Sequence, residues 1–156
     1  SNPNRNLIAI EIRKPMVEFV KDEITRENPE LSNLFLLHGK AEIFLEDIIE
    51  DETLDRIFLF HPDPWLKLRH NKRRVIQPIF LDLIYKKLKN AGKIFISTDV
   101  KNLWLDMNDT FKNNKKFKEI NGSEEKNFWE KEYTTHWNKY SKNEKRNLFY
   151  GTFIKG

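Results

Sequence analysis

The sequence has 156 residues, of which 38% are hydrophobic and 33% are charged, and its formal net charge is +4. This length predicts one domain with a buried core, over residues 1–156. The absence of cysteine excludes disulfides and cysteine zinc sites. No apolar run approaches the roughly 20 residues of a membrane span, and the first residues lack a secretory signal. We therefore expect a soluble cytoplasmic protein with no membrane partner.

Short apolar runs alternate with helical patterns over the first two thirds of the chain. The apolar runs predict strands at residues 7–12, 34–38, 54–60 and 93–98. The helical patterns cover residues 14–27, 41–49, 75–89 and 101–111, and we expect Gly92 to end the third helix. Strands that alternate with helices predict an α/β fold with a mainly parallel sheet and helices on both faces.

The last third of the chain has a different composition. Residues 112–147 are rich in Lys, Asn and Glu and contain few aliphatic residues. We interpret them as loops and a polar, mobile segment around isolated aromatic residues. Residues 148–154 are apolar again and predict a final strand, antiparallel to its neighbour in the sheet.

Cations are concentrated between Lys67 and Arg74, a run with five formal positive charges and one histidine. Such a density suggests a polyanionic partner, because each neutralised phosphate releases condensed counterions. An isolated basic run is more often a solvated charged face. Its neighbours in the sequence therefore decide between the two interpretations.

Three acidic features follow predicted strands, at the edge where open α/β sheets bind ligands. Glu11 is a candidate for the sugar hydroxyls of an adenosine-like ligand, although an ordinary acid at a strand end is an equal alternative. Asp63 lies between Pro62 and Pro64, which stiffen the backbone. Asp99 follows the fourth strand.

The aromatic residue after these prolines favours a nucleic-acid site over a simple turn. Trp65 can stack on a base, Asp63 can accept hydrogen bonds from a base edge, and the cations that follow can hold phosphates. A structural turn could use the same prolines, but it would need neither the tryptophan nor the basic run.

The segments 60–65 and 69–74, Phe-His-Pro-Asp-Pro-Trp and Arg-His-Asn-Lys-Arg-Arg, resemble the signature of the tRNA guanine-N7 methyltransferases. Residues 10–13 and 98–99 are similar to two further motifs of that family. The resemblance implies a Rossmann-like class I methyltransferase fold whose C-terminal strand is antiparallel. The family's first strand and its glycine-rich loop would precede Ser1, so we expect this sequence to lack them.

The resemblance also implies an activity and its partners. Family members transfer a methyl group from S-adenosylmethionine to N7 of the guanosine at position 46, in the variable loop of tRNA. The implied co-substrate is S-adenosylmethionine, the implied partner is tRNA, and no metal is expected. A eukaryotic member would add a β-propeller partner subunit and a nuclear location.

The family's site residues fall on positions across the whole chain. The catalytic aspartate falls on Asp63 and the ribose-binding glutamate on Glu11. Lys40 and Ala41 stand beside the donor's adenine, but Lys40 replaces an acid and cannot accept a hydrogen bond from the adenine amino group. The positions that face tRNA are Lys67, Arg69, His70, Lys72, Arg73, Arg74, Asp99, Thr135 and Asn138.

These residue types suit methylation at a ring nitrogen. N7 of guanine already has an exposed lone pair, so placement matters more than a strong base. A fixed carboxylate at Asp63 would stabilise the positive charge that develops on the purine. Two other classes of function stay open: a non-catalytic RNA-binding relative, which Lys40 and Asn138 favour, and a generic basic nucleic-acid-binding domain, which would not need these acids.

Overall fold

The computed structural model describes residues 5–65, 72–133, 135, 144 and 146–156. The chain divides into two compact units, Ser1–Ile49 and Glu50–Gly156. Each is described by itself below, and the single catalytic domain stays a prediction. In the part of the chain that the structure describes, no helix combines the length and the apolar character needed to cross a membrane.

The first unit contains two parallel strands, β1 (Leu7–Glu11) and β2 (Leu34–His38). The helix α1 (Lys14–Glu27) connects them, and α2 (Ala41–Asp47) follows β2. Pro15 lies in the first turn of α1, where its missing N–H costs no helical hydrogen bond. The register pairs Glu11 with His38, so both strands end at the same edge.

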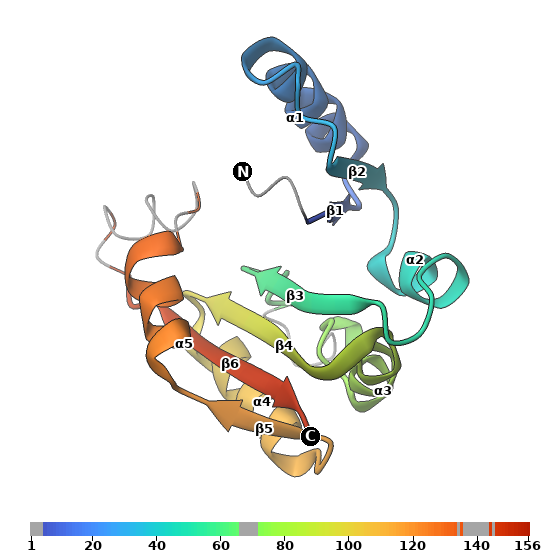
Figure 1. Cartoon of the computed structure of the whole chain (residues 1–156). Helices are drawn as coiled ribbons and strands as arrows, with labels where there is room; N and C mark the ends of the chain where they lie inside the picture. Colours follow the sequence, from blue (N-terminus) through green and yellow to red (C-terminus); the bar gives the residue numbers. More distant parts are fainter. Residues whose placement is uncertain (1–4, 66–71, 134, 136–143, 145) are drawn as a thin grey trace. The chain divides into compact units, whose positions relative to one another are not determined.

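The second unit contains a four-stranded sheet in the order β3-β4-β6-β5 (Figure 1). Its strands are β3 (Leu54–Phe60), β4 (Leu88–Thr98), β5 (Phe117–Ile120) and β6 (Phe149–Lys155). β3 and β4 are parallel, whereas β6 is antiparallel to both β4 and β5. The expected antiparallel C-terminal strand is therefore confirmed, and so is the α/β fold.

Helices cover both faces of this sheet (Figure 1). They are α3 (Pro78–Lys87), α4 (Lys101–Asn113), α5 (Ser123–Asn127) and the π-helical turn η2 (Phe128–Glu132). Phe111 of α4 stacks on Phe153 of β6 with 4.0 Å between the ring centroids. Trp129 of η2 donates a hydrogen bond to Thr152, the preceding residue of β6. Because adjacent side chains of a strand point to opposite faces, α4 and η2 lie on opposite sides of β6.

The core of the second unit is dominated by aliphatic and aromatic side chains. Ile94, Phe95 and Ile96 in the centre of β4 are fully buried. An aromatic cluster around Phe95 includes Trp129 and Tyr133 and is closed by partly buried Phe60, Phe128 and Leu148. Phe60 is the last residue of β3, so this cluster lies at the carboxyl end of β3, next to the turn that follows.

Two expectations from the sequence are wrong. The third helix ends at Lys87, and Gly92 lies inside β4 instead of capping that helix. Ala91 has a φ of 58°, and the β3–β4 register shifts between Leu54 and Arg56. The second error concerns residues 117–132, which were predicted as a loop. They form β5, α5 and η2, because the buried side chains of Phe117 and Trp129 anchor them.

Candidate functional site

The turn after β3, His61 to Trp65, places Asp63 at the carboxyl end of the strand, where its side chain is exposed. His61 and Trp65, at the two ends of the turn, have φ values of 47° and 43°. Left-handed backbone is uncommon for residues other than glycine and often accompanies functional turns. The contacts on either side of Asp63 must therefore hold this conformation.

His61 anchors the N-terminal end of the turn. Its backbone N–H donates to the carbonyl of Ser97 at 2.8 Å. Its Nε2 lies 2.9 Å from the Tyr133 hydroxyl, and its Nδ1 lies 3.5 Å from Oδ1 of Asp99. Burial lowers the pKa of His61, although the Asp99 carboxylate opposes this change. The ring is therefore neutral near pH 7.

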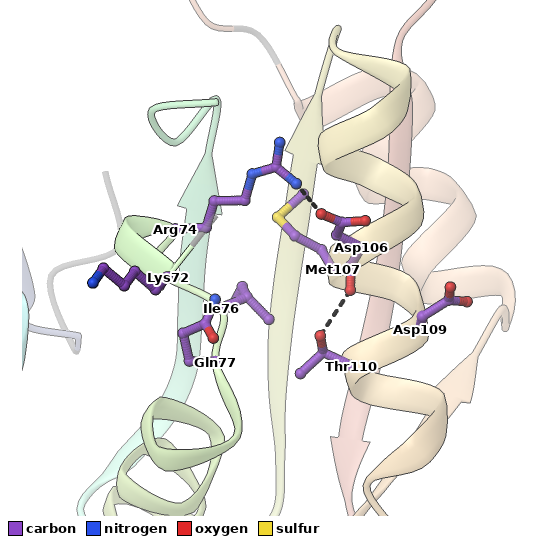
Figure 2. A pocket seen from close by; sticks show the side chains of 8 residues that line it. All are labelled: Lys72, Arg74, Ile76, Gln77, Asp106, Met107, Asp109 and Thr110. Carbon is purple, nitrogen blue, oxygen red and sulfur yellow. Dashed lines mark hydrogen bonds and ion pairs between the residues drawn. The ribbon is translucent and has the colours of Figure 1, made fainter. Parts of the chain in front are cut away.

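Arg74 anchors the C-terminal part of the turn, at Pro64. Its Nε donates to the carbonyl of Pro64 at 2.9 Å, and its Nη1 is ion-paired with the carboxylate of Asp106 in α4. Figure 2 shows the Arg74 and Asp106 side chains pointing toward one another at the edge of a cavity of about 380 Å³. Only 7% of Arg74 is exposed, so its predicted phosphate contact would require it to leave these bonds.

The two cations before Arg74 lie on the surface. Lys72 and Arg73 are exposed, and the Arg73 guanidinium lies 5.1 Å from the centre of the Trp65 ring. At this distance a cation interacts favourably with the face of an indole. Both side chains are therefore accessible to a polyanion.

Asp99 lies close to the turn but is shielded from solvent. Its side chain is 5% exposed and lies between His61 and Arg146, whose Nη1 is 3.1 Å from Oδ2. Asp63 and Asp99 thus follow the adjacent parallel strands β3 and β4. The sequence predicted both carboxylates at strand ends, and the structure places them at the same edge of this sheet.

Glu11 occupies the corresponding edge of the first unit. Its carboxylate accepts hydrogen bonds from the backbone N–H, Nε and Nη2 of Arg13, at 2.8, 2.9 and 3.1 Å. The hydrogen bond from the Arg13 side chain is the main reason that the pKa of Glu11 is lowered. Glu11 is therefore an ionised acceptor with further lone pairs for a hydroxyl.

The turn after β2 brings Lys40 and Ala41 to the same edge as Glu11. Gly39 donates its N–H to the carbonyl of Glu11 at 3.0 Å. A Cβ at Gly39, where φ is 154°, would lie 2.6 Å from the Phe44 ring, so only glycine fits. Lys40 is exposed at the start of α2, and its ammonium offers donors alone.

The remaining predicted site residues fall into two groups. Lys67, Arg69, His70 and Asn138 lie outside the described residues. Thr135 is described, and its side chain hydrogen-bonds to Tyr133. Within the described ranges, no group of three or more His, Asp or Glu side chains is arranged to hold a metal ion.

Sequence reasoning missed three residues of this site: His61 as a turn anchor, Tyr133 and Asp106. His61 precedes the Pro-Asp-Pro motif, which was a signal, but its partner Tyr133 is 72 residues away. Asp106 is one of several polar residues in α4. Its pairing with Arg74 depends on how α4 packs, which local sequence does not reveal.

Comparisons with known proteins place the chain among methyltransferase relatives. A family model described as "Putative methyltransferase" matches residues 1–153. A tRNA (guanine-N(7)-)-methyltransferase of Prochlorococcus marinus is 36% identical over 99% of this chain and 76% of that protein. The enzyme of the same name from Shewanella amazonensis is 43% identical over 64% of this chain. That match covers 41% of the Shewanella protein, so the chain spans less than half of its length.

Solved structures support the fold alone. The precorrin-6y C5,15-methyltransferase of Geobacter metallireducens superimposes with a TM-score of 0.57 at 14% identity. The superposition covers 99% of this chain and 70% of that one. At this identity the likeness extends to the Rossmann-like methyltransferase architecture and to nothing finer.

Proposed function

Because the chain belongs to the tRNA (guanine-N(7)-)-methyltransferase family, we propose that the protein transfers a methyl group from S-adenosylmethionine to N7 of a guanosine in tRNA. The observation that carries the proposal is the turn around Asp63. It presents an exposed carboxylate between two prolines, anchored by His61 in front and by Arg74 behind. The motif of residues 60–74 supports position 46 of the tRNA as the target.

The residues of the first unit fit part of the methyl donor. The ionised carboxylate of Glu11, held by Arg13, suits the two hydroxyls of a ribose. Lys40 offers no acceptor for an adenine amino group, so its side chain does not fit that part of the donor. When bound, S-adenosylmethionine would supply a methyl group on a positively charged sulfur.

The chain's own contribution is placement and charge. We assign Asp63 to hold the guanine through its N1–H and N2–H groups, which keeps N7 at near-attack distance from the methyl group. The same carboxylate stabilises the positive charge that appears on the purine as the methyl group transfers. Lys72 and Arg73 are exposed for tRNA phosphates. Asp99, whose side chain is 5% exposed between His61 and Arg146, would have to leave one of these contacts to hold the base.

The test is methyl transfer to unmodified tRNA by the full-length protein and its Asp63 variants. We expect Asp63→Ala to abolish most activity with little change in the melting temperature, because the side chain is exposed. Asp63→Asn should lose roughly a hundredfold in kcat, since it keeps an acceptor but removes the charge. Asp22→Ala, at an exposed acid of α1, is the matched control and should match the wild type.

Two outcomes would contradict the proposal. Wild-type turnover in Asp63→Ala would remove this carboxylate from the mechanism. A wild-type protein that binds tRNA but methylates none would favour a non-catalytic RNA-binding relative. Lys40 supports that alternative, because its side chain can only donate hydrogen bonds.

A further inference from the structure

Hydrogen bonds link Ser97, Tyr133 and His61 next to the Asp63 turn, and the proposed chemistry does not explain them. The Tyr133 hydroxyl lies 2.7 Å from Oγ of Ser97 and 2.9 Å from Nε2 of His61. The other ring nitrogen of His61 faces the carboxylate of Asp99. Ser97 is fully buried and Tyr133 is 5% exposed. Water therefore has little access to these groups, and the polar atoms depend on one another.

The charge states of these side chains indicate which atom donates in each hydrogen bond. Burial lowers the pKa of His61 and raises the pKa of Tyr133, so both side chains are neutral near pH 7. Nδ1 lies 3.5 Å from Oδ1 of Asp99, which also pairs with Arg146, and this arrangement favours the tautomer in which Nδ1 of His61 carries the proton. Nε2 must then accept from the Tyr133 hydroxyl, and the Tyr133 oxygen accepts from Ser97. Every donor in this chain points toward Asp99.

These contacts join three segments of the predicted site. Ser97 and Asp99 belong to the end of β4 and the turn after it, and His61 is adjacent to the Pro62–Asp63 peptide. Tyr133 follows η2, and its hydroxyl also bonds to the side chain of Thr135. The phenol ring is fixed independently, because it packs 4.8 Å from the Phe60 ring and 4.9 Å from Trp129.

We propose that His61 and Tyr133 are positioning residues for the methyl transfer, which hold the turn that carries Asp63, together with the shielded carboxylate of Asp99, in one fixed arrangement. This inference rests on the proposed function. For Asp63, the support is the left-handed backbone of His61, with a φ of 47°, which the side-chain contacts of His61 hold directly before Pro62. For Asp99, the support is that its carboxylate faces both His61 and Arg146.

A rival explanation is that this chain of hydrogen bonds only stabilises the fold. The two roles predict different kinetics. A residue that only stabilises lowers the melting temperature and leaves kcat per folded molecule unchanged. A positioning residue lowers kcat at temperatures where the variant is fully folded, because a displacement of about 1 Å at the reacting groups costs on the order of a hundredfold in rate.

Tyr133→Phe is the sharpest variant, because it removes one hydroxyl and keeps the ring in the aromatic cluster. We expect kcat for tRNA methylation to fall by about tenfold to a hundredfold, with KM for tRNA within about twofold. Tyr150→Phe is the matched control: Tyr150 stacks on the same Trp129 but is 46% exposed. It should keep wild-type kcat, and both variants should be assayed well below their melting temperatures.

An NMR measurement tests the hydrogen-bond chain without any activity. In histidine-labelled wild-type protein near neutral pH, we expect His61 to be the Nδ1–H tautomer with Nε2 accepting a hydrogen bond, assigned by its loss in His61→Phe. Tyr133→Phe should shift the Nε2 resonance, whereas Tyr150→Phe should not. An Nε2–H tautomer in the wild type would overturn the proposed direction and with it the inference.

The kinetic outcomes separate this inference from the proposed function. Wild-type kcat in Tyr133→Phe, in a protein that methylates tRNA and depends on Asp63, would overturn the positioning role and leave the proposed function intact. A fall in kcat that is matched by Tyr150→Phe would also overturn it. An inactive wild-type protein would refute the proposed function, and the NMR measurement would still decide whether the hydrogen-bond chain exists.

Discussion

Three consecutive cations of one motif lie in two different environments: Lys72 and Arg73 in one, and Arg74 in the other. The first two are exposed, whereas Arg74 is 7% exposed and bonded to Pro64 and Asp106. A cation contributes to tRNA affinity by releasing counterions from a phosphate, which requires a free and accessible head group. Arg74 already uses its guanidinium inside the protein, so the same motif contains both exposed cations, which we propose for tRNA, and a structural anchor.

The largest effect should come from Arg74→Ala, which leaves the Pro64 carbonyl and the Asp106 carboxylate without this partner. We expect the free energy of unfolding to fall by about 2–4 kcal/mol, since hydrogen bonds to charged groups are strong and the arginine stem is buried. Urea denaturation measures this loss, and Arg73→Ala is the control. Equal losses in the two variants would contradict the distinction between the two environments.

Arg74→Lys should have an intermediate effect. A lysine keeps the charge but lacks the planar fork that serves Pro64 and Asp106 together. We expect a loss of about 1–2 kcal/mol in the free energy of unfolding, and a decrease in methylation, because the rear of the Asp63 turn is held by one bond fewer. Full stability in this variant would show that charge alone, and not bond geometry, anchors the turn.

Asp106→Ala should have a smaller effect than either arginine variant. The Asp106 side chain is 51% exposed, so solvent screens its ion pair with Arg74. Arg74 also keeps its bond to the Pro64 carbonyl in this variant. We expect a loss of about 1 kcal/mol in the free energy of unfolding. A loss as large as that of Arg74→Ala would mean that Asp106, and not the Pro64 carbonyl, is the main partner.

Much of the fold could be predicted from local apolar patterns. Residues 14–27, 34–38 and 54–60 have the predicted bounds, because buried strands and amphipathic helices have distinct periods. Gly92 misled the prediction, since a local capping rule competed with pairing to β3 that extends β4 back to Leu88. Residues 117–132 were missed because a few aromatic side chains, and no aliphatic pattern, anchor them.

The candidate site was predictable in its acids and unpredictable in its supports. Asp63 and Asp99 follow parallel strands, and topology alone brings such ends to one edge. The bond between His61 and Tyr133 spans 72 residues, so no local signal indicates it. The burial of Arg74 was equally hidden, because a run of cations in the sequence does not show which side chain points inward.

The smallest effect on stability, and the sharpest on tRNA binding, should come from the exposed pair. Lys72→Ala and Arg73→Ala should each change the free energy of unfolding by less than about 0.5 kcal/mol, as is usual for surface substitutions. Each should make the plot of log K for tRNA against log salt less steep by roughly 0.7–0.9, the value for one lost phosphate contact.

Arg74→Lys serves as the matched comparison for binding, because it keeps the charge and a folded protein. Its salt slope should equal that of the wild type, because the substitution keeps the positive charge at position 74. A slope in Lys72→Ala and Arg73→Ala that also equals the wild type would remove this pair from the tRNA interface. The affinity for tRNA would then have to come from cations elsewhere in the chain.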